Sequence, residues 1–181
     1  MEQKRVFVGV SISDEARDAV SDYIDMLRKR HATIGARWLP RENLHVTLRF
    51  VGNVSMSDLS ELDERTRDVS KAGAPFEATL EGTGNFAQRR IRSDALWIGI
   101  KADRLVAIAA ALADGKGRPF VPHLTIVRLK DPMGGKELAG DHLASSFGPV
   151  AFPIDELVIF ESTLHPTGPV YSVLSKHPLK G

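Results

Sequence analysis

The chain has 181 residues, of which 43% are hydrophobic and 26% charged, and its formal net charge at pH 7 is +1. This is the composition of an ordinary globular protein, and the near-neutral charge excludes a strongly cationic protein that coats duplex nucleic acid. Cysteine is absent and no apolar run approaches a membrane span or a signal peptide, so we expect one cytoplasmic domain over residues 1–181 with no membrane partner.

The first part of the chain predicts alternating strands and helices. Valine-rich segments indicate strands, and helices with one apolar stripe begin at small polar residues that can cap them. In chain order we predict a strand at 5–13, a helix begun by Ser13 or Asp14 that runs to about residue 30, a strand at 44–51, and a helix begun by Ser57 or Asp58.

The second part begins after the breaker Gly73-Ala74-Pro75 and contains more strands. In chain order we predict strands at 76–81 and 95–100, a helix at 105–112 capped by Asp103, a strand at 120–129, a helix at 136–145, and strands at 152–162 and 170–175. Several consecutive strands have the spacing of hairpins. This pattern favours an α+β fold with mainly antiparallel sheets over a doubly wound parallel sheet.

Two short segments of the chain repeat one pattern. Residues 43–50 read N-L-H-V-T-L-R-F, and residues 121–128 read V-P-H-L-T-I-V-R. Each contains a His-x-Thr-x tetrad, at 45–48 and 123–126. Each tetrad follows a strand–helix unit and precedes a helix and a strand pair. This parallel predicts two lobes with internal pseudo-symmetry.

Strand alternation places the histidine and the threonine of each tetrad on one face. His45 and Thr47 point the same way, and so do His123 and Thr125, whereas the apolar residues between them point to the opposite face. If the two strands lie side by side at the centre of the molecule, two imidazoles and two hydroxyls converge on one cleft.

Two convergent imidazoles can act as an acid and a base near neutral pH. One takes a proton from an attacking oxygen and the other gives a proton to a leaving oxygen, which are the two transfers that phosphodiester cleavage requires. Threonine hydroxyls and a nearby arginine can stabilise charge on the phosphate oxygens. This scheme needs no metal, and one histidine per strand without an acidic residue facing the same way is unlike a metal site.

Structural roles are the alternative interpretation of these histidines. A single histidine in a strand is more often structural than catalytic, but packing alone does not require His and Thr together twice. His31 ends a helix, His142 lies in the fourth predicted helix, and His165 and His177 lie beside prolines. We interpret these four as structural or solvated.

Five segments spread along the chain carry a resemblance to a known family. They are R-V-F-V-G-V-S-I-S at 5–13, R-W-L-P-R-E-N-L-H-V-T-L-R-F-V-G at 37–52, A-L-W-I-G-I at 95–100, P-H-L-T-I-V-R at 122–128 and F-E-S-T-L-H-P-T-G-P-V-Y-S-V-L at 160–174. Together they resemble the two-histidine (2H) phosphoesterases, and within them the bacterial and archaeal RNA 2′,3′-cyclic phosphodiesterases, or LigT-like 2′-5′ RNA ligases. The stretch 97–123 is shorter than is usual in that family, which affects one wall of the cleft.

The resemblance implies a bilobal, duplicated α+β fold with mainly antiparallel sheets, a central cleft and helices on the outside. It implies hydrolysis of a terminal 2′,3′-cyclic phosphate on RNA to a 2′-phosphate, with no metal or other cofactor. The reverse, ATP-independent 2′-5′ ligation is permitted by the same chemistry. The partners implied are RNA 3′ ends or related nucleotides, and we expect a monomer.

The resemblance also implies roles for individual residues. His45 would protonate the leaving 3′-oxygen and His123 would activate water, while Thr47, Thr125 and Arg128 would hold the phosphate. Strict alternation puts Arg128 on the face opposite His123, so the strand must twist, bulge or end before it.

Aromatic and basic residues outside the tetrads complete the predicted site. Phe7 and Tyr171 are the first candidates to stack on a terminal base, ahead of Trp38 and Phe50. The arginines of the segment 89–92 can grip the RNA backbone if their loop overhangs the cleft.

Two other functions remain open at this stage. One is a phosphodiesterase for another small cyclic or 2′-5′-linked nucleotide, which would use the same site. The other is a non-catalytic module that binds RNA ends or nucleotides, although the presence of both histidines favours an enzyme.

Overall fold

The strands form two sheets in the computed structural model, which describes residues 3–86, 95–113, 119–131, 134–166 and 168–180. The four-stranded sheet has the order β3-β1-β8-β9, with β1 at Lys4–Ser11, β3 at His45–Val54, β8 at Glu156–His165 and β9 at Gly168–Pro178. The five-stranded sheet has the order β2-β6-β5-β4-β7, with β2 at Ala36–Trp38, β4 at Phe76–Phe86, β5 at Ala95–Lys101, β6 at His123–Leu129 and β7 at Val150–Ile154. Neighbouring strands pair antiparallel throughout. The predicted α+β class with mainly antiparallel sheets is therefore confirmed.

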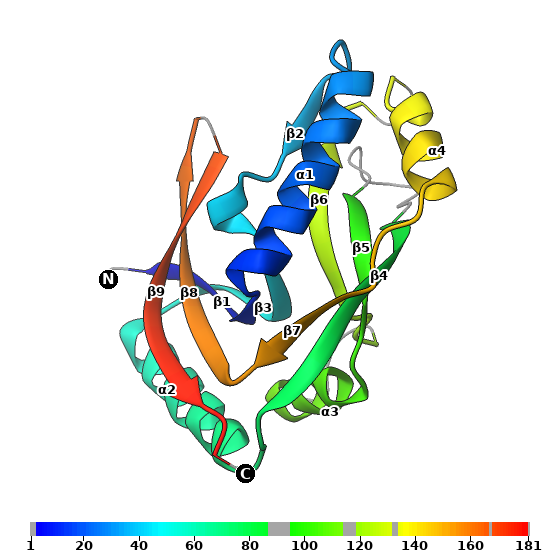
Figure 1. Ribbon diagram of the computed structural model, residues 1–181. Coiled ribbons are helices and arrows are strands. Elements are labelled where there is room, and N and C mark those ends of the chain that lie inside the picture. Colours follow the sequence, from blue (N-terminus) through cyan, green and yellow to red (C-terminus); the bar gives the residue numbers. More distant parts are fainter. Residues whose placement is uncertain (1–2, 87–94, 114–118, 132–133, 167, 181) are drawn as a thin grey trace.

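The helices pack on the two sheets from outside (Figure 1). They are α1 at Asp14–Arg30, α2 at Met56–Lys71, α3 at Asp103–Leu112 and α4 at Lys136–Ala144, with a short 3₁₀ turn, η1, at Arg41–Asn43. α2 packs on β8 and β9, and α3 contacts both α2 and β3. α1 and α4 contact β7 and β4 of the other sheet. Within the described residues, no helix is both long enough and apolar enough to cross a membrane.

Helix starts agree with the sequence for α1 and α4 and differ for α2 and α3. α1 begins as predicted, because the Ser13 hydroxyl accepts a hydrogen bond from the Ala16 N–H. α2 begins earlier than predicted, because Ser55 forms a capping box with Asp58. Asp103 is not the cap of α3 but lies in its first turn, where its charge favours the helix dipole.

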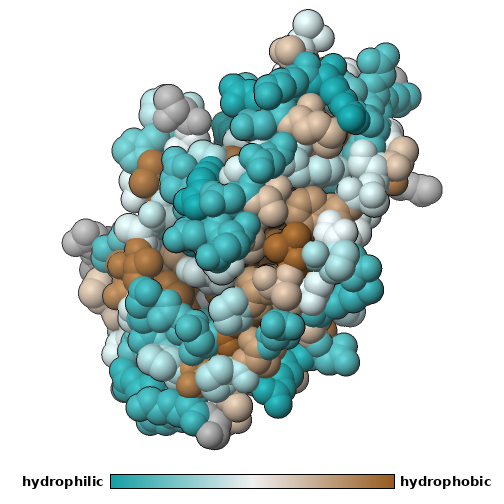
Figure 2. All heavy atoms as spheres, viewed as in Figure 1, coloured by the Kyte–Doolittle hydropathy of each residue, from teal (hydrophilic) through white to brown (hydrophobic). Residues whose placement is uncertain are grey.

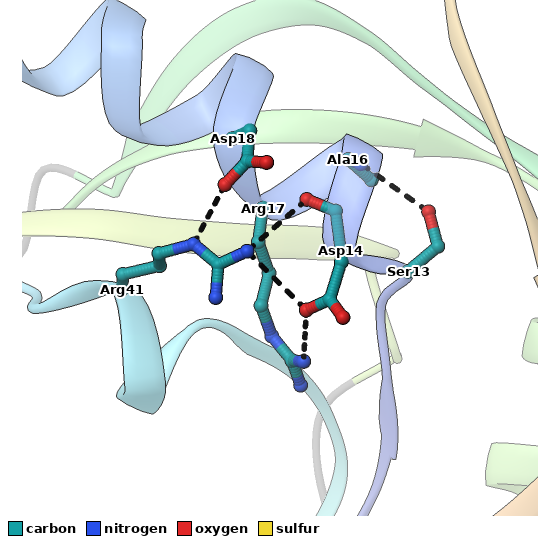
Figure 3. Close-up of polar contacts among 6 residues, drawn as sticks. All are labelled: Ser13, Asp14, Ala16, Arg17, Asp18 and Arg41. Carbon is teal, nitrogen blue, oxygen red and sulfur yellow. Dashed lines mark hydrogen bonds and ion pairs between the residues drawn. The ribbon is translucent and has the colours of Figure 1, made fainter.

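The turn that precedes β3 is tied to the start of α1 (Figure 3). The Arg41 side chain of η1 reaches Asp18 at 2.7 Å and Asp14 at 3.3 Å, and Arg17 bonds the same Asp14 carboxylate. These exposed ion pairs contribute little to stability individually. They link the chain just before His45 to the adjacent helix.

Several strand predictions are corrected, and β4 and β9 extend beyond the predicted 76–81 and 170–175. The segment 152–162 is not one strand, since β7 and β8 belong to different sheets and only Asp155 lies between them. Both pieces are rich in apolar residues and lack glycine, and the sequence signals of the break are Pro153 and Asp155. β3 does not end before Gly52 but continues to Val54, and glycine is suited to position 52 because φ there is +92°.

The hydrophobic core fills the sheet faces that the helices cover, and a second, smaller cluster lies apart from it. Its members are Phe7, Val158 and Phe160, with Tyr171 packed against them. The arginine segment 89–92 lies outside the described residues.

Candidate active site

The two tetrads line one cavity of about 760 Å³. The strands that carry them, β3 and β6, contact one another but belong to different sheets. All seven residues predicted for the site line this cavity: Phe7, His45, Thr47, His123, Thr125, Arg128 and Tyr171. Sequence reasoning therefore located the cavity, whereas the division of the tetrads between two sheets came only from the structure.

A β-bulge brings Arg128 to the cavity. Thr125 lies opposite Trp97 and Val127 lies opposite Leu96, so Ile126 has no partner on β5. Ile126 and Val127 are both 0% exposed, and Arg128 therefore returns to the face of Thr125. The bulge resolves the conflict with strict alternation.

β3 contains the same irregularity after its own tetrad. Thr47 pairs with Gly9 and Arg49 pairs with Val8, which leaves Leu48 without a partner on β1. The fifth residue after each histidine, Phe50 on β3 and Arg128 on β6, consequently lines the cavity.

Backbone carbonyls fix the orientation of both imidazoles. His45 Nδ1 lies 2.7 Å from the Asn43 carbonyl and His123 Nδ1 lies 2.6 Å from the Val121 carbonyl. A carbonyl can only accept, so each Nδ1 carries a proton and donates it. Each Nε2 is left for proton transfer, and that of His45 lies 2.9 Å from the Thr47 hydroxyl.

The electrostatics of the cavity disfavour the imidazolium form of both histidines. Burial lowers the pKa of His45 to about 4, with further lowering by His123 and Arg128, while the bond to Asn43 acts in the opposite direction. Burial likewise lowers the pKa of His123, and Arg128 adds to the effect. Both rings are therefore neutral at pH 7 in the ligand-free protein.

Aromatic rings hold each histidine in place. Around His45, the ring centroids of Phe7, Tyr171 and Phe160 lie at 4.7, 5.0 and 5.8 Å. Phe7 is 2% exposed and so offers little surface to a ligand, whereas Tyr171 is half-buried.

His123 has an aromatic environment of its own. Phe86 lies edge-on at 4.8 Å and Trp97 lies at 6.0 Å. Sequence reasoning did not identify Phe86, Trp97 or Phe160 as site residues. Their positions depend on which strands pair and in what register, and no local motif gives this information.

Asn43 connects the turn before β3 to the β8–β9 hairpin. Its side chain is buried, and its Nδ2 donates to the Pro169 carbonyl at 2.8 Å. The hairpin carries Tyr171, so one residue bonds the His45 ring through its backbone and the hairpin through its side chain.

The charge around the cavity favours an anionic ligand. Arg5, Arg37 and Arg128 line it, and among the residues that the structure describes none of the three forms an ion pair with a carboxylate. Arg37 lies directly opposite Arg128 across β2 and β6. Like charges in that arrangement repel each other, and a bound anion would relieve the repulsion.

Part of the cavity wall is apolar. Leu164 and Val170 of the β8–β9 hairpin are exposed and line it. Figure 2 shows hydrophobic residues along this hairpin on the face in view. A nucleobase, which has a flat apolar face, suits such a wall.

The other histidines lie away from the cavity. His142 is fully buried, where its Nδ1 accepts from the Tyr23 hydroxyl at 3.0 Å. His31 and His177 bond carboxylates on α4 and α2, and His165 is exposed. No group of three or more His, Asp or Glu side chains within the described ranges is arranged to hold a metal ion.

Comparisons with known proteins agree with this fold and sequence. Residues 10–97 and 98–171 each match the family model described as LigT like Phosphoesterase. The chain is 32% identical to an RNA 2′,3′-cyclic phosphodiesterase of Thermotoga maritima, over 98% of this chain and 96% of the relative. It is 29% identical to the protein of the same name in Aquifex aeolicus, over 100% of both.

Solved structures show the same fold. A Thermus thermophilus protein superposes with a TM-score of 0.81 at 27% identity, over 98% of both chains. The apo form of E. coli LigT superposes with a TM-score of 0.78 at 23% identity, over 100% of both chains.

Proposed function

Because the chain belongs to the LigT-like phosphoesterase family, we propose that it opens the terminal 2′,3′-cyclic phosphate of RNA and leaves a 2′-phosphate. The observation that carries this proposal is the pair of tetrad histidines. Both line one cavity with Arg128, and both have Nδ1 committed to the backbone so that Nε2 is available. The substrate class comes from the names of the relatives.

The reaction requires two proton transfers. His123 Nε2 takes a proton from water as its oxygen attacks phosphorus, the bond between phosphorus and O3′ breaks, and His45 Nε2 gives a proton to O3′. The products are a 2′-phosphate and a 3′-hydroxyl; His123 then releases its proton to solvent and His45 takes one up, which resets the site. A 2′-5′ ligation would follow the same ring opening with an RNA 5′-hydroxyl as the nucleophile in place of water.

An acid role for His45 requires that the substrate change its protonation. With a pKa of about 4, His45 is neutral at pH 7 before substrate binds. A phosphodiester anion beside the ring favours the imidazolium and raises this pKa. The substrate thus helps to create the acid that acts on it.

The remaining residues of the cavity hold the substrate. Thr47 and Thr125 donate hydrogen bonds to the phosphate oxygens, and Arg128 balances their charge. Tyr171 offers a partly exposed ring to the terminal base, whereas Phe7 is too buried for that contact and instead positions the His45 ring. The scheme assigns no step to a metal ion.

The first prediction concerns the two histidines. Metal-free protein in EDTA should convert an oligonucleotide with a 2′,3′-cyclic phosphate into its 2′-phosphate. His45→Ala and His123→Ala should each lower kcat by about 10²-fold or more, as expected for an acid or a base. His165→Ala, on the exposed end of β8, is the matched control and should retain activity. Turnover that survives both cavity substitutions would rule out this mechanism.

A modified substrate assigns the two roles. If sulfur replaces the bridging 3′-oxygen, the leaving thiolate needs little protonation. The acid variant should then recover much of its rate and the base variant should not. Recovery by His123→Ala in place of His45→Ala would reverse the assignment.

A further inference from the structure

Part of the cavity floor takes no part in the proposed mechanism. It lies on the four-stranded sheet, where β1, β3 and β8 contribute Arg5, Phe50 and Ser162. We call these three residues the Arg5 subsite. Their parity places them on the sheet face that also carries His45 and Phe7.

Phe50 is unusual for a large apolar residue because it is 58% exposed inside a cavity. It occupies the position on β3 that Arg128 occupies on β6, five residues after the histidine. The Arg5 guanidinium lies over the Phe50 ring, 5.0 Å from its centroid. At this position β6 presents the Arg128 cation, whereas β3 presents the Phe50 ring with the Arg5 guanidinium over it.

The polar groups of the subsite are available to a ligand. Among the described residues, Arg5 has no carboxylate partner, and the Ser162 hydroxyl, on a residue that is 8% exposed, makes no hydrogen bond with another side chain or the backbone. Ser162 pairs with Tyr171 on β9. Arg5 and Arg128 both act to lower the pKa of Tyr171 against the effect of its burial, so two guanidinium groups lie near one phenol.

The subsite adjoins the place of the terminal base at Ser162 and extends away from the histidines along β1 and β3. On β1, Ser11 pairs with His45 and Phe7 pairs with Phe50, which are four residues apart. At a strand rise of about 3.3 Å per residue, Phe50 is roughly 13 Å from His45 along the strand. The terminal base hangs from the same ribose as the cyclic phosphate and lies beside Tyr171, which pairs with Ser162. The preceding nucleotide then extends along the sheet toward Arg5 and Phe50.

We propose that the Arg5 subsite binds the nucleotide that precedes the cyclic end. Arg5 and Ser162 donate hydrogen bonds to the phosphodiester that joins the last two nucleotides, and Phe50 stacks on the base of the preceding one. The inference rests on the proposed function and makes its substrate an oligonucleotide in preference to a cyclic mononucleotide.

The test compares two substrates: a 2′,3′-cyclic mononucleotide and a trinucleotide with the same cyclic end. The measured quantity is the ratio of their kcat/KM values. Arg5→Gln removes a charged contact to phosphate and Phe50→Leu removes a stacking surface. Each should lower the preference for the trinucleotide about tenfold. Phe50→Tyr keeps an aromatic ring and should keep the preference.

A matched pair of controls lies outside the cavity. The Arg104 guanidinium lies over the Phe76 ring at 5.7 Å, which is the same kind of contact. Arg104→Gln and Phe76→Leu should leave the substrate ratio unchanged. Arg5→Gln should also weaken the salt dependence of the trinucleotide KM. The slope of log KM against log salt concentration should fall by about 0.7, as expected for the loss of one phosphate contact on a single strand.

The outcomes separate the inference from the proposed function. If the wild-type protein cleaves both substrates and Arg5→Gln and Phe50→Leu leave their ratio unchanged, only the Arg5 subsite is overturned. The same holds if the Arg104 and Phe76 controls change the ratio equally. If the wild-type protein cleaves neither substrate, the proposed function is overturned and the subsite with it.

Discussion

At the scale of single residues, the site depends on histidine ring nitrogens that are already hydrogen-bonded to the backbone. Because the Nδ1 of His45 and that of His123 each donate to a backbone carbonyl, neither ring can change tautomer without losing a hydrogen bond. In the proposed mechanism, we therefore expect every transferred proton to pass through an Nε2 atom.

The pH dependence of kcat/KM tests this arrangement. The reaction needs one histidine protonated and the other neutral, and kcat/KM reports the groups of the free enzyme. The pKa of His45 is lowered to about 4, and that of His123 is lowered from 6.5. The singly protonated pair is most abundant between the pKa of His45 and the lowered pKa of His123, so the optimum should lie above about pH 4 and below 6.5, the ordinary pKa of histidine. A profile measured from pH 4 to 9 that peaks above pH 7 would contradict this account.

The sequence predicted the residues whose chemistry is local and missed those that depend on pairing. Alternation alone placed His45 and Thr47 on one face. The sequence placed Arg128 in the site only if its strand is irregular. The bulge at Ile126 is that irregularity. Asn43 was missed because its bond to His45 comes from a backbone carbonyl, which any residue type can supply.

At the scale of elements, the η1 turn and the β8–β9 hairpin act on the site together. The Nδ2 of Asn43 is the donor to Pro169, and two residues further along β9 the Tyr171 ring lies 5.0 Å from that of His45. The hydrogen bond from Asn43 therefore holds the hairpin beside the His45 ring.

Removal of this contact should reduce catalysis more than stability. Asn43→Ala leaves the backbone bond to His45 but deletes the donor to Pro169, so the hairpin and Tyr171 lose their anchor. We expect kcat to fall about tenfold and the free energy of unfolding to fall by about 1 kcal/mol, the usual contribution of one hydrogen bond. Steady-state kinetics and urea titration measure the two effects. Asn53→Ala, exposed on the same β3 strand, is the control, and an equal loss of activity there would refute the role of Asn43.

Element boundaries were predictable where capping or periodicity is strong. The start of α1 at Ser13 is an example. The division of 152–162 into β7 and β8 was missed although Pro153 and Asp155 indicate an interruption. The assignment of the two strands to different sheets was not predictable, since it depends on the partners that each finds. β2 has only three residues, too few to show any period.

At the scale of the whole molecule, each sheet combines strands from both halves of the chain. β1 pairs with β8 in one sheet, and β4 pairs with β5 and β7 in the other. We therefore infer that the two halves fold as one unit, although their tetrads correspond.

Acid should destabilise the protein through its buried histidines. Burial lowers the pKa of His45, His123 and His142, so the unfolded chain binds protons first as the pH falls. The free energy of unfolding should be highest above about pH 6.5 and should decrease toward pH 4. His45→Gln should reduce this decrease by up to about 3 kcal/mol at pH 4.

Urea unfolding at a series of pH values between 7.5 and 4 measures this dependence. For His165→Gln, at an exposed position, the free energy of unfolding should decrease with falling pH as it does for the wild type. Stability that stays constant or rises across this range would contradict the prediction.

The crossing from β7 to β8 has a mechanical consequence. The chain passes between the sheets through Asp155 alone, and the Leu179 N–H holds the Asp155 carbonyl at 2.7 Å. A joint of one residue, bonded on its carbonyl, leaves no slack for a hinge at this point. We therefore expect the two sheets to keep their relative position at this joint during turnover.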